Sequence, residues 1–312
     1  MKLARGLLAA TFCWALTAGC DDPAPTPSDA PPEAAGPAVA AAPEAATLPD
    51  RPLLLGRPPH LSTVTRAEYE PLAAHLAEAI GHRIEVRVPG SYTEVVDLLV
   101  AGKLDMALLT PLTYVEAHRR VPNLRLLVSL LGEGSPKYRG YIVTKLGGKV
   151  HSVADLKGKR FAFVDRGSAS GYLFPAAHLL DAGIDPEKDF AKVVFVGDHP
   201  TVVHDVVAGK VDGGAISSTT FNHLRSESLG SKLEIIAKTD WIPLDAFVAQ
   251  GSLPESVATK LQAALIALNM RTPEGRAVLR GVTTTNGFVP GDDSLYDPVR
   301  RVAERVGKNP TR

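Results

Sequence analysis

The residues best suited to chemistry gather in one stretch, Asp165 to Pro175, which reads DRGSASGYLFP and is called the serine corner. It follows an apolar run typical of a buried strand, and Pro175 should mark the start of a helix, since proline fits only the first turn. Ser168 and Ser170 supply hydroxyl donors, and the glycines beside them leave room for a ligand. N–H groups at a helix start lack partners and carry partial positive charge. The corner therefore predicts a site for a small oxyanion; the alternative is an ordinary serine-capped helix start.

Other chemistries fit the sequence poorly. No lysine follows the glycines, which excludes a P-loop, and neither serine has the Gly-x-Ser-x-Gly spacing of a hydrolase. The two cysteines, Cys13 and Cys20, both precede the folded part, which excludes thiol catalysis and a cysteine metal site there. No His-x-x-x-His or carboxylate cluster indicates a metal. We expect a binding protein without metal or cofactor rather than an enzyme.

An internal repeat predicts how the corner is completed. The segments 92–105 and 199–212 share a helix–Gly–x–Asp pattern, which pairs Tyr92 with His199 and, after the following strands, Thr110 with Ser217. Two lobes built alike bind ligands between them, beyond the carboxyl ends of their strands. Tyr92 and Thr110 then lie on one wall, and His199, Ser217 and the serine corner lie on the other. The alternatives are two generic helix–strand units, with these residues serving only as helix starts and caps.

Several of these side chains carry further expectations. If His199 contacts an anion, its charge should change near pH 6.5, and affinity should weaken as the pH rises. Asp165, Asp198 and Asp212 are expected to be structural, although one of them could accept a proton from the ligand. Aromatic residues outside the repeat, Tyr114 and Trp241, are expected to pack rather than to bind.

Strands and helices alternate along the chain, which predicts largely parallel sheets flanked by helices. The expected strands are 53–55, 83–88 and 106–109, and the expected helices are 68–80, 92–100, 254–269 and 295–306. Hinge strands are expected near 138–145 and 242–250.

The first 50 residues are expected to lie outside the fold. Two basic residues precede a 13-residue apolar stretch, 6–18, which is too short for a membrane span of about 20 residues. It reads as an export signal, 1–19. The sequence around Cys20 resembles a bacterial lipobox, which implies acylation of that cysteine and attachment to a membrane; the alternative is an incidental cysteine. Asp21 resembles an inner-membrane retention signal.

The segment 20–51 reads as the lipidated cysteine and a linker. Between Asp21 and Asp50 there are 10 alanines, 8 prolines, six acidic residues and no basic residue, a composition that cannot bury a core. At about 3 Å per residue this tether reaches roughly 90 Å at most. The rest of the chain holds 32 basic and 28 acidic residues, a mild excess that suits anions and is too weak for nucleic acid.

These motifs resemble those of the phosphate/phosphite/phosphonate-type periplasmic substrate-binding proteins of ABC transporters. The resemblance runs roughly from Leu53 to Val306, and its most specific part is Ser168–Tyr172, which is similar to the family's Ser-Thr-Ser-Gly-Tyr anion loop. Two positions depart from the family pattern, Ala169 in place of Thr and Leu109 in place of an aromatic residue. The other matching segments are Pro71–Leu76, Ser91–Thr93, Asp105–Tyr114, Asp155–Lys159 and Asp198–His199.

The resemblance implies an α/β, two-lobed type II periplasmic binding fold with a two-strand hinge. Lobe 1 comprises residues 52–140 and 245–307, and lobe 2 comprises residues 141–244. The implied ligand-binding residues are Tyr92, Thr110, Ser168, Ala169, Ser170, Gly171, His199 and Ser217. The expected ligand is a small phosphorus oxyanion, and the expected partner is an ABC permease in the inner membrane. The protein itself is expected to be a monomer that is lipid-anchored on the periplasmic face of that membrane. The alternatives are a lipoprotein that feeds a signalling receptor, or a binder of another anion or small organic molecule.

Overall fold

The computed structural model of the chain describes residues 47–57, 66–132, 134–226, 229–282 and 285–307. The predicted signal, Cys20, Asp21 and most of the linker lie outside these residues. Residues 45–312 form one compact unit, and the buried core side chains of this unit lie between Leu53 and Ala303.

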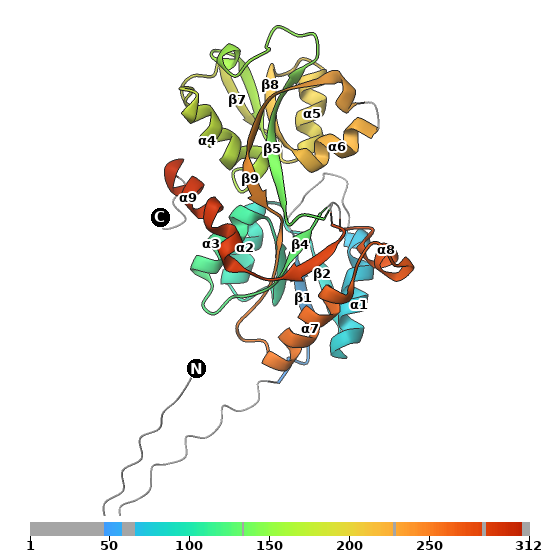
Figure 1. Cartoon of the computed structure of the whole chain (residues 1–312). Helices are drawn as coiled ribbons and strands as arrows, with labels where there is room; N and C mark the ends of the chain where they lie inside the picture. The colour runs from blue at the N-terminus through green and yellow to red at the C-terminus, as the bar shows by residue number, and fades with distance from the viewer. Residues whose placement is uncertain (1–46, 58–65, 133, 227–228, 283–284, 308–312) are drawn as a thin grey trace, which may run out of the picture. The chain divides into compact units, whose positions relative to one another are not determined.

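The unit contains two separate β-sheets (Figure 1). The first sheet has the order β11-β4-β10-β3-β1-β2 and the second has the order β7-β6-β8-β5-β9. The strands of the first are β1 (Leu53–Gly56), β2 (Ile84–Arg87), β3 (Met106–Leu109), β4 (Arg125–Leu131), β10 (Ala246–Ala249) and β11 (Gly287–Pro290). Those of the second are β5 (Lys137–Lys145), β6 (Arg160–Phe163), β7 (Lys192–Phe195), β8 (Gly213–Ser217) and β9 (Leu233–Pro243).

Parallel pairing is confined to the βαβ units. In the first sheet β1 pairs in parallel with β2 and β3, and in the second β6 pairs in parallel with β7 and β8. The strands next to the crossings between the sheets, β4, β5, β9 and β10, pair antiparallel. Each sheet is therefore mixed rather than largely parallel, because the chain must pass between the lobes and return.

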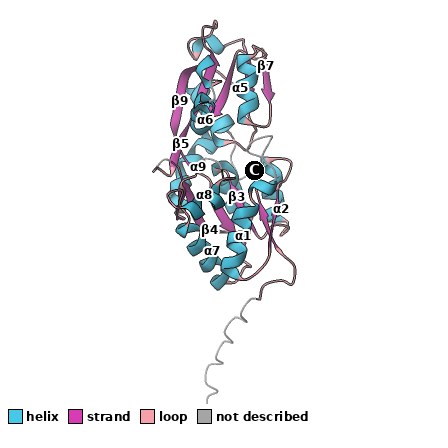
Figure 2. Cartoon of the chain, turned by 90° about the vertical axis from the view of Figure 1, so that its right-hand side faces the viewer, coloured by secondary structure: helices cyan, strands magenta, loops and turns pink. Residues whose placement is uncertain are grey.

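Helices flank both sheets, as Figure 2 shows from the side. The first sheet carries α1 (Glu70–Ile80), α2 (Tyr92–Val100), α3 (Pro111–Arg120), α7 (Glu255–Ala267) and α8 (Pro273–Leu279). The second carries α4 (Phe174–Asp181), α5 (His199–Val207) and α6 (Ser218–Ser226). The last helix, α9 (Asp297–Arg305), contacts α3 of the first lobe and α4 of the second.

The predicted elements agree closely with these bounds. The helix 92–100 and the strand 106–109 are confirmed with the same limits, because each is set by local signals such as the Ser91 cap. The helix predicted at 68–80 begins at Glu70 after a 3₁₀ turn, Arg66–Glu68. The segment 295–306 divides into a 3₁₀ turn, Asp293–Tyr296, and α9. Two further 3₁₀ turns cover Ala154–Leu156 and Gly230–Lys232.

The internal repeat corresponds to two units of the same design. The helices α2 and α5 are both capped by a side chain, Ser91 and Asp198, which accepts the N–H three residues later. Each of the two helices is followed by a glycine of positive φ, Gly102 after α2 and Gly209 after α5. The strand orders β2-β1-β3 and β7-β6-β8 match as well. Tyr92 and His199 therefore occupy equivalent positions, each as the first residue of its helix.

The two aspartates of the repeat tie equivalent strands together. Asp105 accepts hydrogen bonds from the Leu54 N–H at 2.7 Å and from both terminal nitrogens of Arg51 at 2.7 and 2.9 Å. Asp212 accepts from the Arg160 N–H at 2.9 Å and from the Arg160 guanidinium at 2.8 and 3.1 Å. This guanidinium lowers the pKa of Asp212. The role of Asp212 is thus structural, as predicted.

We expect Asp105→Ala to lower the free energy of unfolding by about 2–3 kcal/mol, because it strips a strand N–H and a cation of their acceptor. Asp212→Ala should cost less, about 1 kcal/mol, since its ion pair is more exposed. Urea unfolding followed by circular dichroism measures both values. Ligand affinity should stay unchanged in both variants, and a stability equal to wild type in Asp105→Ala would contradict this role.

Candidate functional site

The serine corner forms a π-helical turn, Ala169–Leu173, which leads directly into α4. The expected helix start near Pro175 is therefore correct to within one residue, since α4 begins at Phe174. Ser168 caps the turn, because its hydroxyl oxygen accepts the Gly171 N–H at 3.0 Å. Both serine side chains are buried. Single-turn π-helices are frequent at functional sites, and the cap leaves the Ser168 O–H able to donate to a ligand.

Close packing holds the corner in place. A Cβ at Gly171 would lie 2.5 Å from Val164 Cγ2, and a Cβ at Gly140 of β5 would lie 2.9 Å from the Ser170 carbonyl oxygen. Burial raises the pKa of Tyr138, and the nearby Ser170 side chain partly offsets this shift. Tyr138 lies at the start of β5, so the corner rests on the strand that enters the second lobe.

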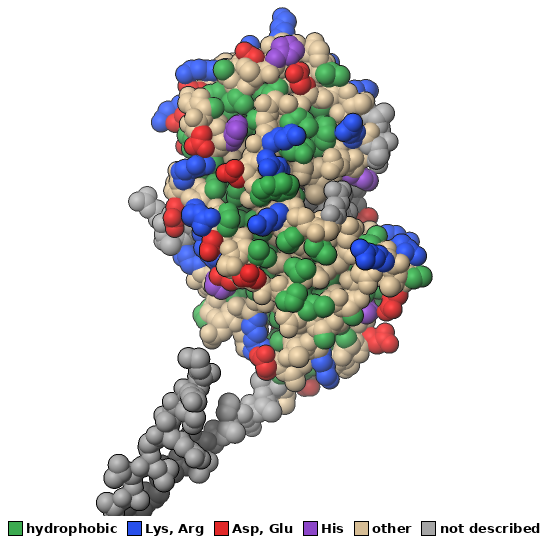
Figure 3. All heavy atoms as spheres, viewed as in Figure 1, with side chains coloured by type: hydrophobic (Ala, Val, Ile, Leu, Met, Phe, Trp, Pro, Cys, Tyr) green, Lys and Arg blue, Asp and Glu red, His purple; other side chains and the backbone are tan. Residues whose placement is uncertain are grey.

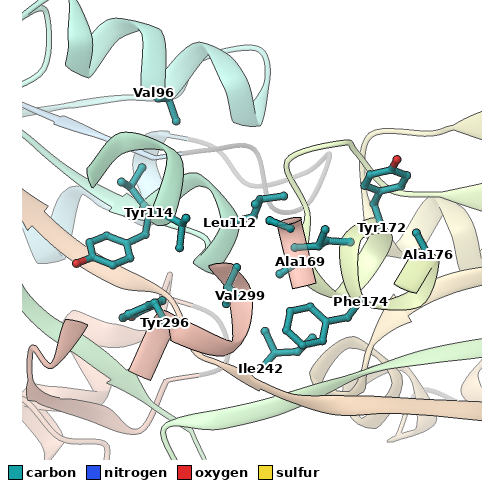
Figure 4. Packing of buried hydrophobic residues seen from close by; sticks show 14 of the residues in the cluster. Val96, Leu112, Tyr114, Ala169, Tyr172, Phe174, Ala176, Ile242, Tyr296 and Val299 are labelled. Atoms are coloured by element: carbon teal, nitrogen blue, oxygen red, sulfur yellow. The ribbon is translucent and has the colours of Figure 1, made fainter. Parts of the chain in front are cut away.

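The corner meets the first lobe at Tyr92. A Cβ at Gly167 would lie only 2.8 Å from Tyr92 Cβ, so the two backbones approach closely. Thr110 Oγ1 donates to the Gly167 carbonyl oxygen at 3.2 Å. Apolar contacts continue this interface, since Leu112 of α3, Ala169 of the corner and Val299 of α9 belong to one buried cluster (Figure 4). The structure thus brings the predicted walls together.

The Tyr92 hydroxyl is buried and has no hydrogen-bond partner among the residues that the structure describes. Burial raises its pKa, so the phenol stays protonated at neutral pH. An unsatisfied buried donor costs free energy, and such a group in a cleft indicates a ligand acceptor. The geometry therefore favours the binding interpretation of Tyr92 over a plain helix start.

Thr110 and Ser217 are both buried and end their strands in different ways. Ser217 Oγ accepts the Thr220 N–H at 3.0 Å, which is the bond of a helix cap. Thr110 precedes α3 but makes no side-chain cap bond; its hydroxyl lies 2.9 Å from the Thr113 hydroxyl and donates to the Gly167 carbonyl oxygen of the serine corner.

His199 corrects one expectation. Its ring is buried, and its Nδ1 accepts the Ser217 N–H at 3.1 Å, which requires the neutral tautomer protonated on Nε2. Burial lowers the pKa of His199 to about 4, a shift that the Asp198 carboxylate partly offsets. The expectation that His199 changes charge near pH 6.5 is wrong, because burial disfavours the imidazolium. At neutral pH the ring is therefore uncharged.

The other expected side chains have structural partners. Asp165 accepts the Gly167 N–H at 2.7 Å, and Asp198 accepts the Thr201 N–H at 2.7 Å. Tyr114 donates to Asp293 at 2.7 Å and packs on Tyr296, as predicted. Trp241 is half exposed, and its ring packs against the Arg139 guanidinium at 4.3 Å.

Sequence reasoning missed the charged part of the cleft. The chain crosses from β4 to β5 and returns from β9 to β10 at residues 244–245, so Asp245 lies in the second crossing. Burial raises the pKa of Asp245 to about 7, and the Arg57 cation partly offsets this shift. The Asp245 residue nevertheless remains partly exposed. An acid between two apolar strands was the sequence signal that could have revealed it.

Arg57 directly follows β1 and is buried. Its guanidinium lies 4.3 Å from the centre of the Tyr69 ring. The Tyr69 hydroxyl, like that of Tyr92, is buried without a hydrogen-bond partner in the described part of the chain. The described residues that meet near the junction of the lobes thus include phenols, serine hydroxyls, one buried cation and one acid with a neutral-range pKa, a set that suits a small, partly protonated oxyanion.

Other features lie apart from this cleft. A surface pocket of about 590 Å³ is lined by Arg51, Arg87 and Lys103, among others, and by none of the predicted site residues. On the face shown in Figure 3, basic and acidic side chains are interspersed. Within the described ranges, His, Cys, Asp and Glu side chains form no group of three that could hold a metal. No helix of that part of the chain has the length and apolar character to cross a membrane.

Two α/β lobes joined by paired crossings define the type II periplasmic binding fold. The family model for the phosphonate periplasmic substrate-binding protein of ABC transporters matches residues 58–296, and the chain belongs to this family. It is a family of transport proteins rather than enzymes.

Individual relatives agree with this assignment. The chain is 27% identical to the phosphate-import protein PhnD of Mycolicibacterium smegmatis, over 80% of this chain and 84% of that protein. It is 23% identical to the phosphonates-binding periplasmic protein of Escherichia coli, over 76% and 71% of the two chains. The crystal structure of PhnD1 from Prochlorococcus marinus with methylphosphonate superposes with a TM-score of 0.75 at 20% identity, over 82% of this chain and 98% of that one.

Proposed function

We propose that the chain is a lipid-anchored substrate-binding protein that captures a small phosphorus oxyanion, a phosphonate, phosphate or phosphite, in the cleft between its lobes. Acylated Cys20 would anchor the monomer to the periplasmic face of the inner membrane, where Asp21 favours retention. The linker would let the domain reach an ABC permease. The observation that supports the ligand class is the serine corner, which combines buried hydroxyls with a helix start and whose Gly167 approaches Tyr92, a residue with a buried, unsatisfied hydroxyl in the described part of the chain.

The donors fit a tetrahedral oxyanion. Ser168 and Ser170 would supply hydroxyl groups, and the N–H groups of Ala169 and Ser170 open the π-helical turn, where backbone donors lack intrahelical acceptors. Tyr92 would donate from the opposite lobe, and His199 through Nε2. Any five of these six donors, at about 1.5–3 kcal/mol each, give roughly 7–15 kcal/mol before entropic costs, enough for micromolar binding at about −8 kcal/mol.

Closure would join the two half-sites. We infer that the lobes 52–140 with 245–307 and 141–244 rotate about the two crossings, from β4 to β5 and from β9 to β10, the hinge mode of periplasmic binders. In the closed arrangement Gly167 contacts Tyr92 and Thr110, which removes the cleft from bulk water. Water exclusion strengthens the hydrogen bonds to the anion.

Calorimetric titration of residues 45–312 tests the ligand class. The panel comprises phosphate, phosphite, methylphosphonate, 2-aminoethylphosphonate and sulfate. We expect micromolar or tighter binding of at least one phosphorus oxyanion, and a 10- to 100-fold weaker affinity in Ser170→Ala, the effect of about one hydrogen bond to a charged group. Ser152→Ala, an exposed capping serine of the same lobe, is the matched control and should bind like wild type.

If the folded wild-type protein binds none of the five compounds, a phosphorus oxyanion is excluded as the ligand, and another anion or a small organic ligand is favoured. Deletion of the gene separates transport from sensing. Loss of ligand uptake supports the importer, whereas intact uptake with altered transcription supports a role in feeding a signalling receptor.

A further inference from the structure

The first lobe contains a second buried phenol whose hydroxyl lacks a partner among the described residues. Tyr69 is 1% exposed, and within those residues its hydroxyl makes no hydrogen bond. Burial raises its pKa, so it remains a donor at neutral pH. Buried tyrosine hydroxyls are normally satisfied by protein or water. Tyr296 shows the usual case, since its hydroxyl donates to the Leu244 carbonyl oxygen at 3.0 Å and lies 3.0 Å from Ser129 Oγ.

The pseudo-symmetry of the fold places Tyr69 at the cleft. β1 and β6 occupy equivalent positions, each second from an edge of its sheet, and each is followed by the first helix of its βαβ unit. The serine corner lies between β6 and α4, and Tyr69 directly precedes α1, the helix that follows β1. Tyr69 is therefore the first-lobe counterpart of the serine corner, at the carboxyl ends of the parallel strands where ligands bind.

The charged residues of the cleft surround this hydroxyl. After burial, Arg57 and Asp245 are the strongest influences on the pKa of Tyr69, and the same two charges act most strongly on Tyr92. The two phenols therefore lie in one electrostatic environment, although they come from different helices. Arg57 stacks on the Tyr69 ring at 4.3 Å, a cation–π contact that fixes the ring plane and hence the direction of the hydroxyl.

We propose that Tyr69 is a further ligand-contacting residue, which donates a second phenolic hydrogen bond from the first lobe to the bound oxyanion, with Arg57 as its positioning residue. This inference rests on the proposed function. Tyr92 and Tyr69 then match the two serines of the opposite lobe, and the site holds the anion through neutral donors on both walls. Arg57 adds a positive electrostatic potential at the bound anion while its guanidinium stays stacked on the Tyr69 ring.

Tyr69→Phe tests the donor directly, with Tyr296→Phe as the matched control. We expect Tyr69→Phe to weaken phosphorus oxyanion binding about 10- to 100-fold, while the melting temperature of the ligand-free protein stays equal or rises, because no existing hydrogen bond is lost. Tyr296→Phe should do the reverse, lowering the melting temperature and leaving affinity within about twofold. Calorimetry and thermal unfolding of residues 45–312 give both readouts.

Arg57→Gln tests the positioning role through a pH profile. Because the Arg57 cation opposes the upward shift of the Asp245 pKa, its removal should move the midpoint of the affinity–pH profile upward, and Arg57→Lys should restore most of this shift. A purely structural Arg57 would leave the midpoint unchanged.

The outcomes separate this inference from the proposed function. If Tyr92→Phe and Ser170→Ala lose affinity while Tyr69→Phe binds like wild type, Tyr69 is not a ligand contact, and the proposed function stands. A Tyr69→Phe protein of lower stability and unchanged affinity would show a structural partner for the hydroxyl and overturn the proposal. A wild type that binds no phosphorus oxyanion removes both the function and the inference.

Discussion

Gly167→Ala should weaken ligand binding by more than about 100-fold, through loss of the two or three hydrogen bonds that one wall contributes on closure. The added Cβ would lie 2.8 Å from Tyr92 Cβ and 3.4 Å from Thr113 Cγ2. Both neighbours belong to the first lobe and the glycine to the second, so these two contacts arise when the lobes meet. Neither Cβ can move without its backbone. Asp165 Oδ1 of the glycine's own lobe would lie 3.2 Å away, but it is the end of a side chain that can shift by a few tenths of an ångström. The variant should therefore fold normally and remain open.

Two measurements check this expectation. Calorimetry gives the affinity, and small-angle X-ray scattering with and without ligand reports whether the protein becomes more compact. Gly90→Ala is the matched control, because its Cβ would meet only the end of the flexible Glu94 side chain, at 3.3 Å. Wild-type affinity and full compaction in Gly167→Ala would mean that the ligand-bound lobes do not meet at Gly167 and Tyr92.

The second large effect is a pH dependence centred on Asp245, whose pKa burial raises to about 7. An oxyanion next to this carboxyl favours its protonated form, which can donate a hydrogen bond, and disfavours the carboxylate, which repels it. Affinity should therefore fall as the pH rises from 6 to 8, by up to about tenfold per unit above the pKa. A His199 that lost its charge in this range would also make the affinity fall with rising pH, but we assign the effect to the Asp245 carboxyl.

Asp245→Asn isolates this effect from titration of the ligand. The ratio of wild-type to Asp245→Asn affinity, measured calorimetrically at each pH, cancels the ligand's own protonation. The ratio should fall as the pH rises through 7. A ligand that presents a cation to Asp245 would produce the opposite slope, because a carboxylate attracts it, and that result would exclude a simple oxyanion contact at this position.

The same pKa predicts the stability of the ligand-free protein. Between pH 4 and 7 the folded state holds a proton on Asp245 that the unfolded state has lost, so this residue's contribution to stability is present at low pH and is lost as the pH rises through 7. At pH 8 Asp245→Asn should be more stable than wild type by about 2–4 kcal/mol, at about 1.4 kcal/mol per pKa unit. At pH 4 the difference should nearly vanish.

The sequence by itself determined the local parts of the protein. The Ser91 and Asp198 caps, the positive-φ glycines at 102 and 209 and the short apolar strands are set by neighbouring residues, which is why helix 92–100 and strand 106–109 are predictable with their limits. The serine corner is recognisable because its hydroxyls and glycines are contiguous. The repeat alone pairs Tyr92 with His199, because the two segments share one pattern of helix, glycine and aspartate.

Only the tertiary structure decided which side chains carry charge and which lack partners. Burial by residues far away in the sequence lowers the pKa of His199, raises that of Asp245 and leaves the Tyr69 and Tyr92 hydroxyls unsatisfied within the described ranges. Asp245 reaches the cleft because the chain crosses between the sheets at that residue, and Arg57 does so because β1 ends there. Desolvation and the electric field depend on three-dimensional neighbours, and no pattern of adjacent residues encodes them.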